Sequence, residues 1–188
     1  MKRGLLIVIS GPSGVGKGTV LKQLFSQYDH FFYSISATTR APREGEVHGK
    51  DYYFISTREF ESHIENGDML EYACYNGCYY GTPRQAVEKK LDEGLDVILE
   101  IEVQGAAHVK QAMPDCLSVF IAPPSFEELS RRLTQRGTET EEKVNSRLQI
   151  ALEELKRQNE YDTVIVNHTP RQASDELYAV ITQAKKSL

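Results

Sequence analysis

The chain has 188 residues, of which 40% are hydrophobic and 26% are charged, and its formal net charge is −5. This length and composition are typical of a single globular domain, and they exclude a disordered or low-complexity chain. The acidic balance argues against a general nucleic-acid-binding protein, which would present a basic face.

A glycine-rich loop follows the first predicted strand, the apolar run 5–9, and precedes a predicted helix with an apolar stripe. Strand, loop and helix in this order favour a phosphate-binding loop over an ordinary turn. The loop N–H groups and the helix N-terminus can surround an anion, and Lys17 can reach terminal phosphates as a point charge. The residues expected to hold phosphate are Gly11, Pro12, Ser13, Gly14, Val15, Gly16, Lys17, Gly18 and Thr19.

The next segment, from about residue 37 to 82, is richer in strand signals than the chain around it. It follows a second predicted strand over 31–36, begins with polar sequence interrupted by proline and glycine, and continues into a short aromatic strand. Thr57 is expected to cap a helix, and residues 69–81 are expected to form a hairpin. This stretch is therefore expected to be a small insertion.

Strands and helices alternate through the rest of the chain. Thr82 is expected to cap a helix, with Pro83 in its first turn. Strands are expected over 95–101, 117–121 and 162–167, and the first of them, which is expected to be buried, carries Glu100 and Glu102 near its end. The pattern predicts an α/β fold with a doubly wound parallel sheet, whose ligands bind at the carboxyl ends of the strands.

Arginines are concentrated where two predicted helices meet, within residues 126–155. Ser125 begins a capping box for the first helix, and Thr138 is expected to cap the second, which carries Arg147. From spacing alone these arginines could form a solvated helix face or a set of phosphate ligands. The other residues of this cluster are Arg131, Arg132 and Arg136.

Two motifs together resemble the guanylate kinase family. The first is the phosphate-binding loop, and the second is Thr38-Thr39-Arg40-x-x-Arg43-x-x-Glu46-x-x-Gly49-x-x-Tyr52-x-Phe54. Shorter matches at 79–82, 104–105, 121–125, 136–142 and 164–167 extend the resemblance over nearly the whole chain. Each short match is weak alone, but their order and spacing are highly specific.

The resemblance implies an enzyme that transfers the γ-phosphoryl group of ATP to GMP, giving ADP and GDP, with Mg²⁺ as cofactor. It implies a P-loop core (1–36, 83–125 and 156–188), a GMP-binding insertion (about 37–82) and a helical lid (about 126–155). By motif position, guanine would be met by Ser36, Glu71 and Thr82, and the GMP phosphate by Arg40, Arg43, Tyr52 and Tyr80. Lys17, Arg132, Arg136 and Arg147 would act on the transferring phosphoryl group, and Glu100 would lie on the GMP side.

The sequence departs from these patterns at two places. Gly18 stands where a phosphate-binding loop usually carries the Ser or Thr hydroxyl for Mg²⁺, and Thr19 follows one place later. Glu100 and Glu102 stand where the family usually has Asp, so each carboxylate extends one methylene further. The metal is therefore expected to be held mainly by nucleotide oxygens and water, with Thr19 and Glu100 as candidates acting through water.

Three other functions are less consistent with the sequence than the one that this resemblance implies. A nucleoside monophosphate kinase with another base preference is disfavoured by Ser36 and Glu71. An interaction module of the same fold typically lacks the loop lysine, and a GTPase would need an Asn-Lys-x-Asp motif that does not occur. Single residues also have other possible roles. The tyrosines assigned to the GMP phosphate could instead only pack the hairpin, and Glu71 could be an ordinary exposed carboxylate.

The expected partners are ATP and GMP, with no nucleic acid and no membrane, and the sequence leaves the oligomeric state open. No run of 18 apolar residues occurs, and the chain start lacks the pattern of a signal peptide. The three cysteines, at 74, 78 and 116, lack zinc-site spacing, so reduced thiols and a cytoplasmic location are expected.

Overall fold

The computed structural model describes residues 2–75, 77–135 and 141–186. The chain forms two compact units, one of Met1–Val8 with His30–Cys116 and one of Ile9–Asp29 with Leu117–Leu188. Within the described ranges, no helix is both long enough and apolar enough to cross a membrane.

Five strands form the main sheet, in the order β2-β7-β1-β8-β9. They are β1 (Leu6–Ser10), β2 (Phe31–Tyr33), β7 (Asp96–Glu100), β8 (Leu117–Ala122) and β9 (Thr163–Val166). The pairs β2–β7 and β8–β9 are parallel, and every residue of β1 is buried. Parallel strands covered on both faces consist of unbroken apolar runs, which is why the sequence predicted this α/β sheet correctly.

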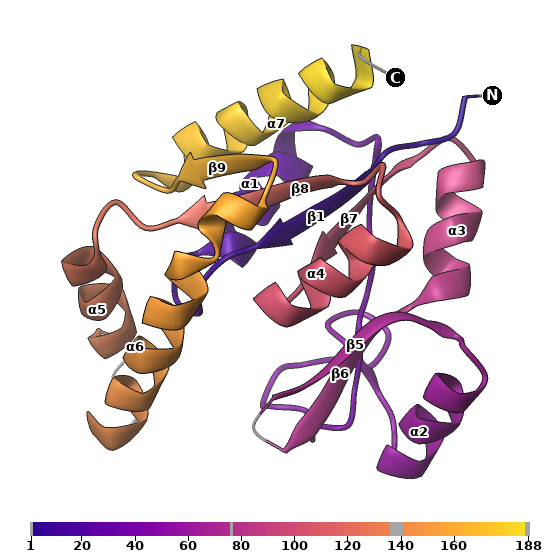
Figure 1. Ribbon diagram of the computed structural model, residues 1–188, viewed down its shortest axis with the longest axis horizontal. Coiled ribbons are helices and arrows are strands. Elements are labelled where there is room, and N and C mark those ends of the chain that lie inside the picture. Colours follow the sequence, from indigo (N-terminus) through magenta and orange to yellow (C-terminus); the bar gives the residue numbers. More distant parts are fainter. Residues whose placement is uncertain (1, 76, 136–140, 187–188) are drawn as a thin grey trace. The chain divides into compact units, whose positions relative to one another are not determined.

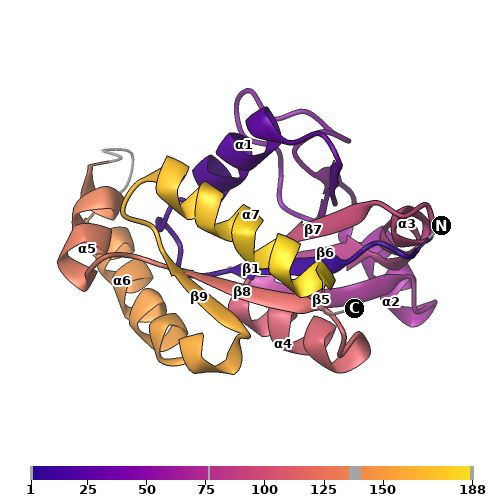
Figure 2. The ribbon, with the colours of Figure 1, turned by 90° about the horizontal axis from the view of Figure 1, so that it is seen from above.

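The second unit surrounds its strands with helices α1 (Lys17–Gln27), α5 (Phe126–Thr134), α6 (Glu141–Lys156) and α7 (Pro170–Lys186), and with the 3₁₀ turn Gln158–Glu160. Helices α1 and α7 pack together (Figures 1 and 2), and the rings of Tyr28 and Tyr178 stack with centroids 3.6 Å apart. Leu24 of α1 and Leu177 of α7 are fully buried. The apolar stripes of these helices therefore face the core.

The first unit contains a second sheet, in the order β4-β3-β6-β5. Its strands are β3 (Ala37–Thr38), β4 (Tyr53–Phe54), β5 (Met69–Tyr75) and β6 (Cys78–Pro83). The other helices of this unit are α2 (Thr57–Glu65), α3 (Arg84–Asp92) and α4 (Val103–Ala112). Helix α2 packs on one face, where Phe60, Ala37 and Met69 form a buried cluster.

The register of β5 and β6 determines which side chains share a face of this sheet. Glu71 pairs with Thr82, whereas Met69 pairs with Pro83, because the register shifts between Met69 and Glu71. Since successive side chains of a strand point to opposite faces, Glu71 and Thr82 lie on the face opposite α2. The irregularity thus separates the acidic side chain from the α2 core.

Two predicted helix caps were wrong. Ser56, not Thr57, caps α2 by accepting a hydrogen bond from the Glu59 amide at 3.2 Å. Thr82 is still part of β6, and Pro83 occupies the N-cap position of α3 without a side-chain cap bond. The Ser125 cap is confirmed by its bond from the Glu128 amide, whereas Thr138 lies outside the described residues.

Candidate active site

The phosphate-binding loop connects β1 to α1 in the second unit. Gly11 has φ 143°, and a Cβ there would lie 2.2 Å from the carbonyl oxygen of Ile121. Gly16, at the N-cap of α1, adopts a left-handed conformation with φ 97°. Only glycine fits both conditions without strain. Because no side chain caps α1, its first amides remain available to an anion.

Lys17 begins α1 and reaches back over this loop. Its ammonium group donates to the carbonyl oxygens of Gly11 and Pro12, the latter at 3.2 Å. Pro12 and Val15 are buried, Gly14 and Gly18 are half-buried, and Thr19 is exposed. The loop lysine is thus held at the mouth of the loop by neutral acceptors, which a phosphate can replace.

Two of the predicted arginines lie on the same loop. Arg132 of α5 donates to the carbonyl oxygens of Val15 and Asn167, both at 3.1 Å, while its Nε donates to Glu128 at 2.8 Å. Arg147 of α6 donates to the Ser13 hydroxyl at 2.6 Å. Helices α5 and α6 thus bring both guanidinium groups to the phosphate-binding loop, while Arg136 lies outside the described residues.

Glu128 organises the arginine side of this loop. Its carboxylate accepts hydrogen bonds from both Arg131 and Arg132, and these two cations lower the pKa of Glu128 to about 2. Arg131 points away from the loop, where it also contacts Gln135. Glu128 therefore remains ionised at working pH and holds Arg132 in place.

Asn167 is a contact of this loop that sequence reasoning did not assign. Its buried side-chain amide donates to the carbonyl oxygen of Val15 at 2.8 Å. The residue belongs to the matched string 164–167, but the string itself carries no sign of a contact with the loop. The approach depends on where β9 ends, which only the fold reveals.

Glu71 and Thr82 form the centre of the predicted guanine site in the first unit. Glu71 is only 5% exposed, and its Oε1 accepts a hydrogen bond from the Thr82 hydroxyl at 2.7 Å. Burial raises the pKa of Glu71 to about 7, against the opposing effect of the bonds from Thr82. This burial rules out the alternative that Glu71 is an ordinary exposed carboxylate.

Gly105 makes room for this carboxylate. A Cβ on Gly105, in the first turn of α4, would lie 2.3 Å from Glu71 Oε2. Any larger residue would therefore displace the acid. Ser36 lies just before β3, half-buried, and its carbonyl oxygen accepts the Tyr53 amide.

Arg40 belongs to the predicted phosphate set and has several side-chain contacts. Its two terminal nitrogens form a paired contact with Glu46 at 3.0 and 2.9 Å, and its guanidinium lies 5.4 Å from the centre of the Tyr52 ring. The rings of Tyr52 and Tyr80 meet edge to face at 6.0 Å. Arg43 is exposed, and its amide donates to Glu46. The structure thus gathers Arg40, Tyr52 and Tyr80, and it shows Glu46 as their organiser, a role that the motif alone did not reveal.

Glu100 ends β7 and meets Tyr33, which ends β2. The Tyr33 hydroxyl donates to Glu100 Oε2 at 3.3 Å. Within the described residues, no group of three or more His, Cys, Asp or Glu side chains could hold a metal ion.

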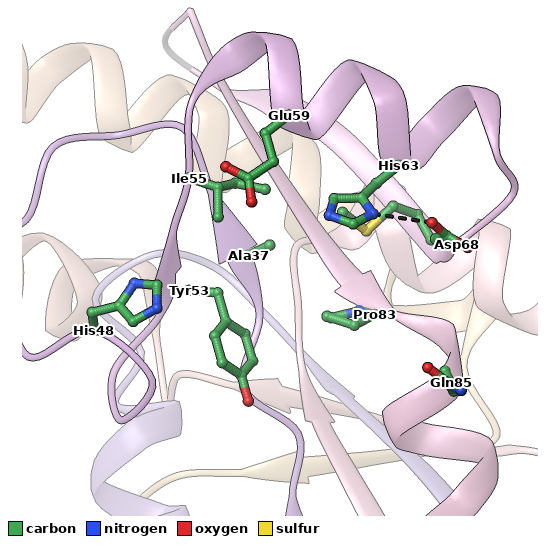
Figure 3. A pocket seen from close by; sticks show the side chains of 10 residues that line it. Ala37, His48, Tyr53, Ile55, Glu59, His63, Asp68, Pro83 and Gln85 are labelled. Carbon is green, nitrogen blue, oxygen red and sulfur yellow. Dashed lines mark hydrogen bonds and ion pairs between the residues drawn. The ribbon is translucent and has the colours of Figure 1, made fainter.

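A cavity of about 360 Å³ opens on the face of the small sheet on which α2 packs (Figure 3). Ala37 and Pro83 contribute to it from the strands, and His63 of α2 lies against it, paired with Asp68 at 3.0 Å. The strand register places Glu71 and Thr82 on the opposite face. This cavity is therefore separate from the predicted guanine site.

Comparisons with known proteins identify the family of this chain. A family model described as guanylate kinase matches residues 3–184. Guanylate kinases of Streptococcus thermophilus and Bacillus subtilis are 55% and 52% identical to this chain over 181 residues, covering 96% of it and 87% and 89% of their own lengths. The crystal structure of guanylate kinase from Anaplasma phagocytophilum matches with a TM-score of 0.81 and 36% identity, over 97% of this chain and 86% of that one. The chain belongs to the guanylate kinase family.

Proposed function

We propose that the two units carry the two halves of one reaction, the transfer of the γ-phosphoryl group of ATP to GMP to give ADP and GDP. The second unit would bind the phosphates of ATP, and the first would bind GMP. Phosphoryl transfer needs little covalent help from a protein, so positioning and charge stabilisation account for most of the catalysis.

The phosphate-binding loop is the proposed ATP site. Its uncapped amides and the N-terminus of α1 would surround the phosphates, and Lys17 would exchange its carbonyl partners for phosphate oxygens. Arg132, Arg136 and Arg147 would meet the transferring group. Arg132 and Arg147 are supported by their contacts with Val15 and Ser13 of this loop.

The face of the small sheet that carries Glu71 is the proposed guanine site. Guanine presents two adjacent donors, N1–H and the 2-amino group, and one carboxylate can accept both in a charge-assisted pair. Adenine has an acceptor at N1, so it would leave a buried carboxylate unsatisfied. Ser36 and Thr82 would contact the remaining base edge, and Arg40, Arg43, Tyr52 and Tyr80 would hold the phosphate.

Mg²⁺ is the proposed cofactor. Bound to the nucleotide phosphates, it would neutralise negative charge that develops on them. Glu100 would accept a hydrogen bond from metal-bound water, and the Thr19 hydroxyl is a second candidate, since Gly18 has no side chain to offer. A cytoplasmic location belongs to the same proposal, because ATP and GMP are nucleotides of that compartment.

The observation that best supports this proposal is the buried Glu71 carboxylate, paired with Thr82 on the face opposite α2. The test is an ADP-release assay with ATP and a panel of nucleoside monophosphates. GMP is expected to be by far the best acceptor. Absence of ADP release with every monophosphate would instead favour an interaction module.

Substitution of Lys17 tests the ATP side of the proposal. Lys17→Ala is expected to lower the turnover number by at least about 10²-fold, because a preorganised charge on the phosphates is lost. Lys22→Ala, on the exposed side of α1, is the matched control and is expected to keep wild-type turnover. Wild-type turnover in Lys17→Ala, with the fold intact by circular dichroism, would exclude the assigned role.

A further inference from the structure

Asn167 is held directly after β9, next to the phosphate-binding loop of the same unit. Strand β9 pairs with β8 up to Val166, opposite Ala122, and the backbone amide of Asn167 continues this ladder by donating to the Ala122 carbonyl oxygen at 2.8 Å. The residue is only 2% exposed, and a Cβ on Gly16 would lie 2.8 Å from its Nδ2. The glycine of the loop therefore leaves the room that this side chain occupies.

The orientation of the Asn167 side-chain amide is set by one acceptor. Its Nδ2 donates to the carbonyl oxygen of Val15 at 2.8 Å, whereas Oδ1 is buried and has no hydrogen-bond partner within the described residues. With the amide turned over, Oδ1 would face the Val15 oxygen, and two acceptors would meet without a hydrogen between them. The bond to Val15 is thus the polar contact that the side chain contributes to this loop.

The Arg132 guanidinium is bound to both ends of this contact. One terminal nitrogen donates to the Val15 oxygen that Asn167 also meets, and the other donates to the backbone oxygen of Asn167, each at 3.1 Å. Each terminal nitrogen has a second N–H group, which can donate to a phosphate oxygen. The spacing of the two carbonyl oxygens therefore determines where the guanidinium lies and where those N–H groups point.

We propose that Asn167 is a positioning residue for Arg132. Its side chain ties the Val15 carbonyl to the residue that supplies the second carbonyl, so the two acceptors keep the spacing that the guanidinium requires. An arginine that stabilises a phosphoryl transition state has to be in place before the reaction, because its rearrangement would add to the barrier. This inference rests on the role proposed above for Arg132, and Asn167 acts through that residue.

Removal of the side-chain amide is the first test. Asn167→Ala is expected to lower kcat about 10- to 100-fold, since a displacement of about 1 Å at a catalytic group can cost that much. The KM for GMP is expected to change little, because the predicted GMP residues belong to the other unit. The Val15 oxygen keeps its bond from Arg132, so the substitution leaves that acceptor satisfied and the fold is expected to persist.

Two further variants make this test specific. Asn167→Asp keeps the shape of the side chain but replaces its donor by an oxygen, and it is expected to lower kcat at least as much as Asn167→Ala. The matched control is Asn159→Ala, an exposed asparagine in the 3₁₀ turn of the same unit, and it is expected to keep the wild-type kcat. Thermal unfolding of each variant ensures that kcat is measured on folded protein.

A double-mutant cycle shows whether the loss acts through Arg132. In the Arg132→Ala background, Asn167→Ala is expected to cause no further fall in kcat, because the group that it positions is already gone. A residue that only supports the fold would lower kcat by the same factor with or without Arg132. Equal losses in the two backgrounds would therefore overturn the positioning role.

This inference and the proposed function fail in different ways. If Arg132→Ala lowers kcat and neither Asn167 variant does, the positioning role is wrong and the role of Arg132 stands. If Arg132→Ala keeps the wild-type kcat, the role proposed for Arg132 fails, and the inference about Asn167 fails with it. Absence of GMP-dependent ADP release from the wild-type enzyme would overturn the proposed reaction and this inference together.

Discussion

Among single residues, Glu71 is the one expected to contribute most to the selection of guanine over adenine. Its carboxylate is buried, accepts one hydrogen bond from Thr82 and lies close to the α-carbon of Gly105. A buried carboxylate is costly unless donors satisfy it, and guanine offers two at the required spacing. The same cost would make the proposed guanine site reject a base that lacks those donors.

Glu71→Gln is expected to remove this discrimination. A glutamine can accept only one of the two guanine donors, and its own N–H₂ group would face the other. The ratio of kcat/KM for GMP to that for AMP is expected to fall from about 10⁴ by at least two orders of magnitude. Glu61→Gln, an exposed carboxylate of α2, serves as control. An unchanged ratio in Glu71→Gln would mean that guanine is read elsewhere.

Several residues that organise the site were beyond the reach of sequence reasoning. Glu46 and Gly105 lie within recognised strings, but their roles depend on side chains brought close by the fold. Residue types at fixed spacing pointed to Lys17, whose chemistry is local to the phosphate-binding loop, whereas Glu71 was expected only from the family resemblance. Positioning contacts between distant strands leave no comparable pattern.

At the scale of elements, the sequence predicted which segments form helices and strands better than it predicted where these begin and end. Apolar runs predicted β1, β7, β8 and β9, because strands of a parallel sheet are rich in hydrophobic residues. In β9 only Ile165 is buried. The caps of α2 and α3 were misplaced by one residue. For α2 the adjacent Ser56 and Thr57 both belong to the residue types that favour caps. The sequence alone did not decide the role of Thr82, because its hydroxyl could cap a helix or donate to Glu71.

Helix α5 allows the lid hypothesis to be tested with neighbouring residues. Arg132 contacts the phosphate-binding loop, whereas Arg131 points to Glu128 and Gln135 on the exposed side. Arg132→Ala is expected to lower kcat by about 10³-fold, as for other arginines that stabilise a phosphoryl transition state. The KM for GMP is expected to change little, because Arg132 lies in the other unit from the GMP residues. Arg131→Ala is the matched control, and equal kcat values for the two variants would mean that Arg132 belongs only to a solvated face.

At the scale of the whole molecule, an acidic chain has to bind two polyanions. The sequence contains 27 acidic and 22 basic residues, yet the predicted phosphate ligands are concentrated in a few motifs. Arg40 pairs with Glu46, and Arg132 pairs with Glu128, so each guanidinium is already held in an extended position. Nucleotide phosphates can replace or join these partners, so local arrangement of charge matters more than the net charge.

Burial of the Glu71 carboxyl is expected to lower the stability of the folded protein at alkaline pH. The pKa of Glu71 is about 7 in the folded chain, above the ordinary value of 4.5, because burial disfavours the charged form. The folded protein therefore binds more protons than the unfolded chain between these values, and this residue lowers stability as pH rises through that window. By about pH 8 the whole penalty is present, up to about 3 kcal/mol.

Glu71→Gln is thus expected to stabilise the nucleotide-free protein at pH 8 while it weakens GMP use. Its melting temperature should lie several degrees above that of the wild type at pH 8, by roughly 2–4 °C per kcal/mol for a chain of this size. The difference should shrink toward zero as the pH falls to about 4, where the carboxyl is mostly protonated in the folded and the unfolded chain alike. Glu61→Gln, whose carboxylate lies in water, should show no such growth between the two pH values. A Glu71→Gln protein that is no more stable than the wild type at pH 8 would mean that the ionised carboxylate is fully compensated by its surroundings, and the burial argument would fail.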